Sequence, residues 1–200
     1  MSPRSGPDPA RRNERSRHAI LAAAMELLAE TGYADLTIEA IAARAGVGKQ
    51  TIYRWWPGKG AIILDAMADP AVIRDAALPD TGDVRADLYS VIRSTVAELA
   101  DPHLSAVSRA LTIETLAHDA LAEQVRERLL RPHLDAIKDR LRSAQRAGQL
   151  RPDVDLDQAV ELLIGPPYHR WMLRTGPLTE RYADTVVDLA LAALAPPVAG

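Results

Sequence analysis

The 200-residue chain contains no cysteine. It can form no disulfide and no thiolate metal site, and it has no cysteine nucleophile, a composition that fits a protein of the reducing cytoplasm. No apolar stretch approaches the ~20 residues that a membrane-spanning helix needs. The N-terminal stretch MSPRSGPDPARRNERSR lacks the apolar segment of a signal peptide, so we expect a cytoplasmic protein that does not enter a membrane.

Motifs of catalysis are also missing. The chain has no nucleophile-elbow pattern, no glycine-rich phosphate loop and no His-Glu-x-x-His motif. His103, His118 and His133 are spaced by fifteen residues, and we expect no i,i+4 carboxylate partner of the kind that a helical metal site uses. The alternating aspartates of residues 153–157 lack the glycine and the final glutamate of a calcium loop, and an acidic helix N-terminus explains them better. We therefore expect no enzyme, no metal and no cofactor.

The charged residues are unevenly distributed. Residues 1–60 carry nine Lys/Arg and six Asp/Glu, a net charge of +3, whereas the remainder carries 15 and 21, a net charge of −6. A basic N-terminal part on an acidic body indicates that only the N-terminal part meets a polyanion. Sampling scatter would give a similar imbalance, so charge alone does not decide the question.

Helical periodicity runs through the chain, and no stretch alternates as a strand does. In the first predicted helix, at 12–31, apolar residues between Ile20 and Leu28 form one stripe, and Gly32 ends the helix. Pro132 is expected to kink a long helix. These patterns predict an all-α protein, with an N-terminal three-helix helix-turn-helix domain and a C-terminal helical bundle. Further helices are expected after Thr37, at about 49–55, from about Lys59, and at 84–100, 103–117, 120–147, 155–174 and 179–195.

The N-terminal segment is rich in Pro, Ser, Gly and Arg and is expected to be a disordered arm. Arg4, Arg11 and Arg12 could reach a DNA groove, although a solvated tail explains them equally well. The expected division of the chain is an arm at 1–11, a first helical domain at 12–76 and a second helical domain at 77–200.

Two short helices joined by a glycine-containing turn indicate a helix-turn-helix. Thr37 is placed to cap the first of them, whose inward residues are expected to be Ile38, Ile41 and Ala42. The turn is Ala45-Gly46-Val47-Gly48, and the second helix follows from Lys49. Two cations and two aromatics on an outward face are unusual for a merely solvated helix, and they suit phosphates and base edges. That outward face comprises Lys49, Gln50, Thr51, Tyr53, Arg54 and Trp55, whereas Ile52 and Trp56 are expected to face the core.

The run AGVGKQTIYRWWPGKGAI, with the Thr37 helix start before it, resembles the TetR family of one-component transcriptional regulators over residues 15–67. Residues 80–195 resemble the family's regulatory domain more loosely. The resemblance implies that residues 12–76 are the helix-turn-helix DNA-binding domain with its linking helix, and that residues 77–200 are a ligand-binding and dimerisation domain. Family members usually have Phe in place of Trp56 and commonly Ser in place of Gly48. Because this chain has glycine at position 48, no side-chain hydroxyl is available there for a phosphate contact. The resemblance implies that Thr37, Tyr53 and Lys59 bind phosphates, that Lys49, Gln50, Thr51 and Trp55 lie in the major groove, and that Arg54 does either.

The resemblance also implies a homodimer that binds double-stranded DNA at a near-palindromic operator, as a repressor that a small-molecule effector releases. Two apolar stripes on the last two long helices are candidates for the dimer interface, and covering the protomer's own core is the alternative. The stripes are Leu156, Ala159, Val160 and Leu163 on the first helix, and Val186, Val187, Ala190, Leu191 and Leu194 on the second.

The run Gly165-Pro166-Pro167 is expected to break or kink its helix, because neither proline can donate a backbone hydrogen bond. A kink beside aromatic residues predicts a pocket for a small apolar or amphipathic effector, although such residues are more often plain core. A DNA-binding regulator without a small-molecule ligand stays open as an alternative, as does, less readily, a helical enzyme. The tentative pocket residues are Tyr89, Leu111, His118, Leu134, Tyr168, Trp171 and Met172.

Overall fold

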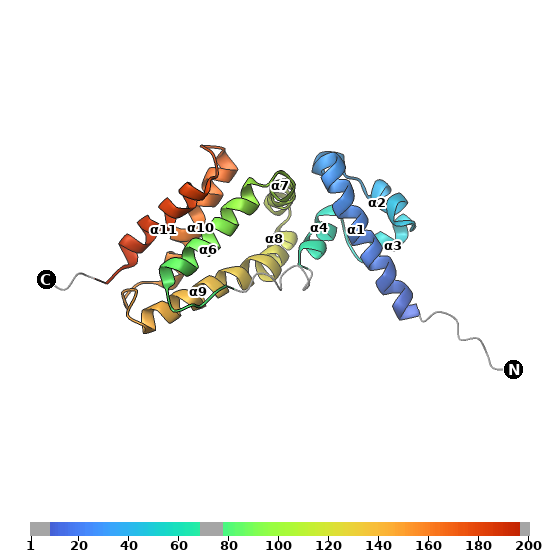
Figure 1. The fold of residues 1–200 in the computed structure, drawn as a ribbon. Helices are drawn as coiled ribbons and strands as arrows, with labels where there is room; N and C mark the ends of the chain where they lie inside the picture. The colour runs from blue at the N-terminus through green and yellow to red at the C-terminus, as the bar shows by residue number, and fades with distance from the viewer. Residues whose placement is uncertain (1–8, 69–77, 197–200) are drawn as a thin grey trace. The chain divides into compact units, whose positions relative to one another are not determined.

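The computed structural model describes residues 9–68 and 78–196, and every regular element in these ranges is helical (Figure 1). The chain forms two compact units. Within the described ranges, the N-terminal unit comprises residues 9–68 and 106–125, and the C-terminal unit comprises residues 78–105 and 126–196. The predicted domain boundary after residue 76 lies outside the described residues and stays a prediction.

The N-terminal unit contains α1 (Pro9–Asp35), α2 (Ile38–Ala45), α3 (Lys49–Tyr53) and α4 (Lys59–Met67), together with most of α7 (Pro102–Ala117) and all of α8 (Asp119–Val125). Its core includes the predicted stripe of the first helix, because Ile20, Ala23, Ala24, Leu27 and Leu28 are all buried. Figure 1 shows α2 and α3 beside the long α1.

Helix α1 begins at Pro9, three residues before the predicted start, so residues 9–11 belong to a helix and not to an arm. A proline in the first turn costs no hydrogen bond, and the alanine and arginines after it favour helix. Residues 1–8 of the predicted arm, with Arg4, lie outside the described residues. At Gly32 the backbone turns non-helical (φ 76°), as the sequence predicts, and one further turn reaches Asp35.

At Gly60, α4 approaches the segment of residues 106–125 closely. A Cβ atom at this position would lie 2.9 Å from Leu121 Cδ2 and 3.1 Å from Glu114 Cγ. Only glycine leaves room for this approach of a helix backbone to its neighbours. The contact explains why residues from α7 and α8 pack as part of the N-terminal unit.

The C-terminal unit contains α6 (Val84–Ala100), the start of α7, the π-helical turn η2 (Arg126–Leu130), α9 (Arg131–Arg146), α10 (Leu156–Leu173) and α11 (Glu180–Leu194). Side-chain caps define the starts of α6, α10 and α11. Asp83, Asp155 and Thr179 each accept hydrogen bonds from backbone N–H groups of the first turn. The acidic stretch before α10 is therefore a helix start, as expected.

Pro132 distorts its helix in a defined way. The predicted helix over 120–147 is divided into α8, η2 and α9, and the π-helical turn ends two residues before the proline. A proline removes one backbone donor and crowds the carbonyl four residues earlier. In a π turn each backbone N–H bonds a carbonyl five residues earlier, so the missing donor and the crowded carbonyl are both accommodated. The π-helical turn before Pro132 therefore replaces the expected kink.

Of the break or kink expected at Pro166-Pro167, the break does not occur. Helix α10 continues through both prolines to Leu173 and ends at Arg174, which has a left-handed backbone (φ 53°). Each interior proline costs about 3 kcal/mol in an isolated helix. Here α10 packs against α6, α9 and α11, and Pro167 is itself buried. Burial of the helix therefore outweighs the local preference against proline.

The two stripes predicted for the dimer interface lie in the core of their own unit. Val187 and Leu163 have no exposed surface, and Ala190 is 1% exposed. The alternative of covering the protomer's core is therefore the correct one. All of the stripe residues other than the half-buried Leu156 belong to one buried cluster with α6 and α9, namely Ala159, Val160, Leu163, Val186, Val187, Ala190, Leu191 and Leu194.

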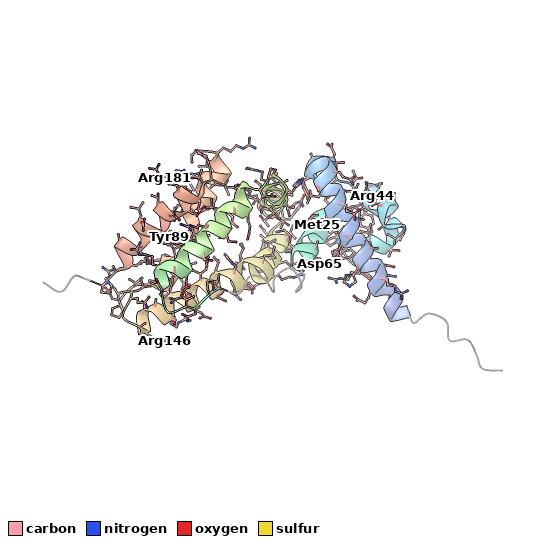
Figure 2. All side chains as sticks on the ribbon, in the orientation of Figure 1. Met25, Arg44, Asp65, Tyr89, Arg146 and Arg181 are labelled. Carbon is pink, nitrogen blue, oxygen red and sulfur yellow. The ribbon has the colours of Figure 1, made fainter. Side chains whose placement is uncertain are left out.

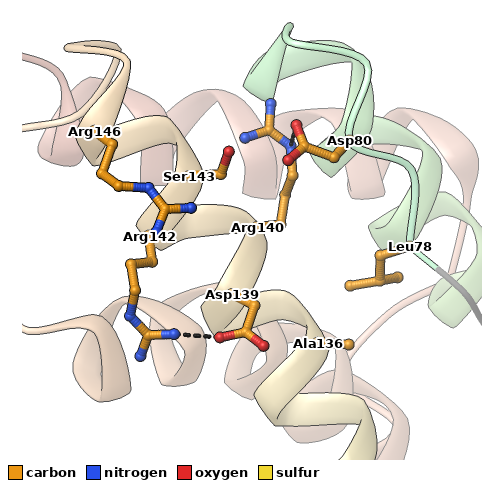
Figure 3. Close-up of a pocket in the computed structure, with 8 residues that line it drawn as sticks. All are labelled: Leu78, Asp80, Ala136, Asp139, Arg140, Arg142, Ser143 and Arg146. Atoms are coloured by element: carbon orange, nitrogen blue, oxygen red, sulfur yellow. Dashed lines mark hydrogen bonds and ion pairs between the residues drawn. The ribbon is translucent and has the colours of Figure 1, made fainter.

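A buried ion pair fastens the start of α6 to α9. The Arg140 Nε donates to Asp87 Oδ2 at 2.5 Å, and the two side chains are 3% and 1% exposed. Thr81 Oγ1 donates to the other carboxylate oxygen at 2.7 Å. Figure 3 shows Arg140 at an open pocket of about 520 Å³, whose wall also carries Arg142 paired with Asp139.

Candidate nucleic-acid interface

The turn between α2 and α3 has the geometry that the sequence predicts. The Ala40 N–H donates to Thr37 Oγ1 at 3.1 Å, so Thr37 caps α2. Gly46 ends α2 in the left-handed region (φ 66°), which favours glycine. Gly48 precedes α3 in extended conformation and offers no side chain as a cap. Two short helices and a tight turn therefore form a helix-turn-helix.

The faces of α3 are distributed as expected. Ile52 is fully buried and Trp56 is 3% exposed, so both face the core. Tyr53 is 56% exposed, which rules out the half-buried packing that would compete with a role in binding. The helix ends at Tyr53, two residues earlier than predicted, and Arg54 and Trp55 continue as a turn.

The outward face of α3 is open. Lys49, Gln50 and Arg54 are exposed, and Thr51 and Trp55 are half-buried. The guanidinium of Arg54 lies 5.7 Å from the centre of the Trp55 ring. Gln50, Thr51, Tyr53 and Arg54 line one shallow concavity of about 510 Å³. This combination of cations, amide, hydroxyls and aromatic surface can meet both phosphates and base edges.

Trp56 does more than fill the space of the usual phenylalanine. Its Nε1 donates to Asp65 Oδ2 at 2.9 Å, and the same oxygen accepts a bond from Arg17 Nη2 at 3.2 Å. Asp65, labelled in Figure 2, belongs to α4 and Arg17 to α1. The end of the helix-turn-helix is thus tied to both flanking helices, which the sequence reading did not anticipate.

Lys59 is engaged inside the unit. Its ammonium donates to the backbone carbonyls of Tyr33 (2.8 Å) and Leu36 (3.0 Å). It also lies 4.1 Å from the centre of the Tyr33 ring. Lys59 therefore closes the end of α1 in the way that a cation satisfies free carbonyls at a helix C-terminus. The phosphate contact predicted for Lys59 stays a prediction.

Lys49 has an acidic neighbour at the start of α2. Its Nζ donates to Glu39 Oε1 at 2.9 Å. The hydrogen bond from Lys49 is the main cause that lowers the pKa of Glu39, and the same bond raises the pKa of Lys49. Both groups therefore stay charged at neutral pH.

The tentative pocket residues are distributed over both units. Leu111 and His118 belong to the N-terminal unit, and the other five belong to the C-terminal unit. His118 Nε2 lies 3.6 Å from Glu114 Oε2, so the expectation that these histidines lack an i,i+4 carboxylate is wrong for His118. In the part of the chain that the structure describes, no group of three possible ligands could hold a metal ion.

Two of the tentative residues, Tyr168 and Trp171, are in contact. Their rings meet edge to face with centres 5.9 Å apart, and the buried Trp171 Nε1 donates to Ser105 Oγ at 2.7 Å. Of the other residues in this unit, Met172 is 50% exposed, Leu134 packs against the core, and the Tyr89 hydroxyl donates to Asp188.

Glu98 and His133 are further polar residues of this region that the sequence reading did not single out as pocket residues. Burial lowers the pKa of His133, and the negative charge of Glu98 opposes the shift. Burial raises the pKa of Tyr168, and Glu98 adds to this shift. The charge of Glu98 therefore acts on both His133 and Tyr168. Only the even spacing of the histidines drew attention to His133.

Comparison with protein-family models identifies the family of both parts of the chain. Residues 20–66 match the model described as bacterial regulatory proteins, tetR family, and residues 78–190 match the tetracyclin repressor-like C-terminal domain. The chain belongs to the TetR family. TetR-family proteins are transcriptional regulators that bind DNA through the helix-turn-helix, and this chain is such a regulator.

Individual relatives agree with this assignment. The DNA-binding transcriptional repressor TetR of Mycobacteroides abscessus is 31% identical over 93% of this chain and 97% of its own. The solved TetR family transcription regulator SCO0332 is 35% identical, with a TM-score of 0.74 over 90% of this chain and 99% of its own. FadR from Bacillus subtilis, solved in complex with stearoyl-CoA, shares the fold at 21% identity, with a TM-score of 0.69 over 88% of this chain and 98% of its own.

Among the helices in the described ranges, none has both the length and the hydropathy needed to cross a bilayer.

Proposed function

We propose that this TetR-family regulator is a homodimeric repressor, which binds a near-palindromic operator and is released from it by a small-molecule effector. The observation that carries the proposal is the open outward face of α3 and the turn after it, where Gln50 and Arg54 are exposed. The similar Mycobacteroides abscessus protein is named as a repressor, which supports the sign of regulation.

The DNA contacts follow from the chemistry of each exposed side chain. The Thr37 hydroxyl and the Tyr53 phenol bind phosphates, which fixes orientation without reading sequence. Gln50 suits the donor and acceptor of adenine, and the Thr51 methyl suits the methyl group of thymine. Lys49 and Trp55 also lie in the groove, and Arg54 binds a phosphate or a base. Lys59 holds the end of α1, and any contact it makes with a phosphate is secondary to that role.

Dimerisation uses the outer faces of α10 and α11, because their inner faces are already buried in the protomer. Leu162 on α10 is 43% exposed and Leu189 on α11 is 68% exposed. A Cβ atom at Gly165 would meet nothing within 4 Å, so another helix has room to approach there. Isologous contact of these faces gives the two-fold symmetry that a near-palindromic operator requires.

The effector site is proposed around Tyr168 and Trp171 in the C-terminal unit. The two aromatic rings, with the charge of Glu98 acting on Tyr168, suit a small amphipathic molecule with one polar end. Leu134, from the same unit, is proposed to complete the wall. The complex of the structurally similar FadR with stearoyl-CoA supports a ligand in this fold. The effector releases DNA by favouring a protomer arrangement that no longer matches successive major grooves.

One experiment tests the whole proposal. Duplexes bound by the full-length protein are selected from a random pool and sequenced, and the selected operator is then titrated with a panel of metabolites. The proposal expects a near-palindromic consensus, and at least one compound that releases the operator and raises the melting temperature. Selection of a consensus with no releasing compound leaves a DNA-binding regulator without a small-molecule ligand.

A further inference from the structure

Glu39 is the only acidic residue between Thr37 and Lys59, and it lies next to the first residue of α3. The Glu39–Lys49 ion pair is highly exposed, with 62% and 53% of the two side chains accessible. Exposed pairs of this kind contribute little to stability. A lone carboxylate on a DNA-binding surface also repels phosphates. The pair therefore needs an explanation other than folding or general affinity for DNA.

The pair presents a donor and an acceptor side by side. Lys49 Nζ and Glu39 Oε1 are 2.9 Å apart. In the major groove, guanine presents the acceptors N7 and O6, and its cytosine partner presents the N4 donor. Guanine O6 and cytosine N4 are hydrogen-bonded to each other, so they also lie at hydrogen-bond distance. The two protein groups thus match the edge of one G·C base pair in polarity and in separation.

From this match we propose that Glu39 and Lys49 together read one G·C base pair in each half-site. Lys49 donates to guanine O6 or N7, and Glu39 accepts from cytosine N4. The inference rests on the proposed placement of α3 in the major groove. Glu39 becomes a specificity-determining residue, because its carboxylate faces an acceptor oxygen when thymine replaces the cytosine, and the reversed C·G pair exchanges the donor with the acceptor.

The test begins by locating the base pair. Operators are selected from a random pool with the wild-type protein and with Lys49→Ala, and the position that loses its preference is the one that Lys49 reads. Four symmetric duplexes are then made that differ only at this position in both half-sites. We expect the wild type to bind the G·C duplex roughly tenfold tighter than the other three, and Glu39→Gln to reduce this ratio below about threefold.

Glu30→Gln is the matched control. Glu30 is an exposed acid of the same unit that pairs with Arg44 at 2.7 Å, on α1 and away from α3. This variant is expected to keep the tenfold ratio. Melting curves of all variants show whether each is folded, and Glu39→Gln is expected to melt close to the wild type because its ion pair is exposed.

Three results would overturn the inference. Glu39→Gln could bind all four duplexes tighter by one common factor, which would show that Glu39 only weakens DNA binding in general through charge repulsion. The position could prefer a pair other than G·C, or Lys49→Ala could leave every position unchanged. In all three cases the wild type still binds its operator, so the proposed function stands. A wild type that selects no operator would instead refute the proposed function and the inference with it.

Discussion

Replacing Lys59 can distinguish a structural role of this residue from a contact with DNA. Replacing it with methionine keeps much of the aliphatic stem but removes the charge that bonds the carbonyls of Tyr33 and Leu36 and faces the Tyr33 ring. Hydrogen bonds from a charged donor contribute about 1.5–3 kcal/mol each, and the half-buried setting reduces this. We expect Lys59→Met to lose about 2–4 kcal/mol of unfolding free energy, or roughly 5–12 °C in melting temperature.

The assay combines thermal unfolding with the salt dependence of operator binding. For Lys59→Met, we expect a large loss of stability and a slope of log K against log salt close to that of the wild type. Arg54→Gln is the control, because Arg54 directly follows α3 and its side chain is exposed. It is expected to leave stability unchanged and to lower the slope by about 0.9 for each lost phosphate contact. The reasoning is refuted if Lys59→Met melts like the wild type while its slope falls.

Three further predictions concern stability and assembly. Trp56→Phe should lose about 1–2 kcal/mol in denaturant unfolding because Asp65 loses the indole donor, and equal stability would show that the bond contributes nothing. Val187→Asp should abolish cooperative unfolding because it buries a charge. Leu189→Arg should stay folded and halve the particle mass measured by light scattering, because Leu189 is exposed. A folded monomer from Val187→Asp would contradict this assignment of the inner and outer faces. Burial raises the pKa of Asp87, but hydrogen bonds from Thr81 and from its buried arginine partner outweigh it, so the net pKa is lowered. The stability that this carboxylate provides should be present above the ordinary aspartate pKa of about 3.9 and be lost as the pH falls through the lower folded value. Asp87→Asn should melt lower than the wild type at neutral pH and converge with it in acid, and a constant difference down to acid pH would argue against the assignment.

The helix-turn-helix could be predicted in detail because its signals are local. A threonine cap, a glycine with left-handed backbone and the inward spacing of Ile52 and Trp56 each act within a few residues. The outward face of α3 followed from the same spacing. Its ion pair with Glu39 did not, because ten residues and a turn separate the two partners.

Features that depend on packing between distant segments were less predictable. The Pro166-Pro167 pair indicated a break or a kink, but α10 is continuous and packs against three other helices. The stripe containing Val187 was equally consistent with a dimer interface and a core, since both need the same apolar pattern. Lys59 shows the same limit, because its carbonyl partners lie more than twenty positions earlier in the chain.

The central claim is that the outward face of α3 enters the major groove of duplex DNA. The most direct measurement is the affinity of the full-length protein for its selected duplex at low ionic strength, compared with that of Gln50→Ala and Tyr53→Ala. We expect salt-dependent binding by the wild type, a relaxed preference at one base position for Gln50→Ala, and uniformly weaker binding on all sequences for Tyr53→Ala. The claim is contradicted if the wild type binds no double-stranded fragment, or if both variants bind as it does.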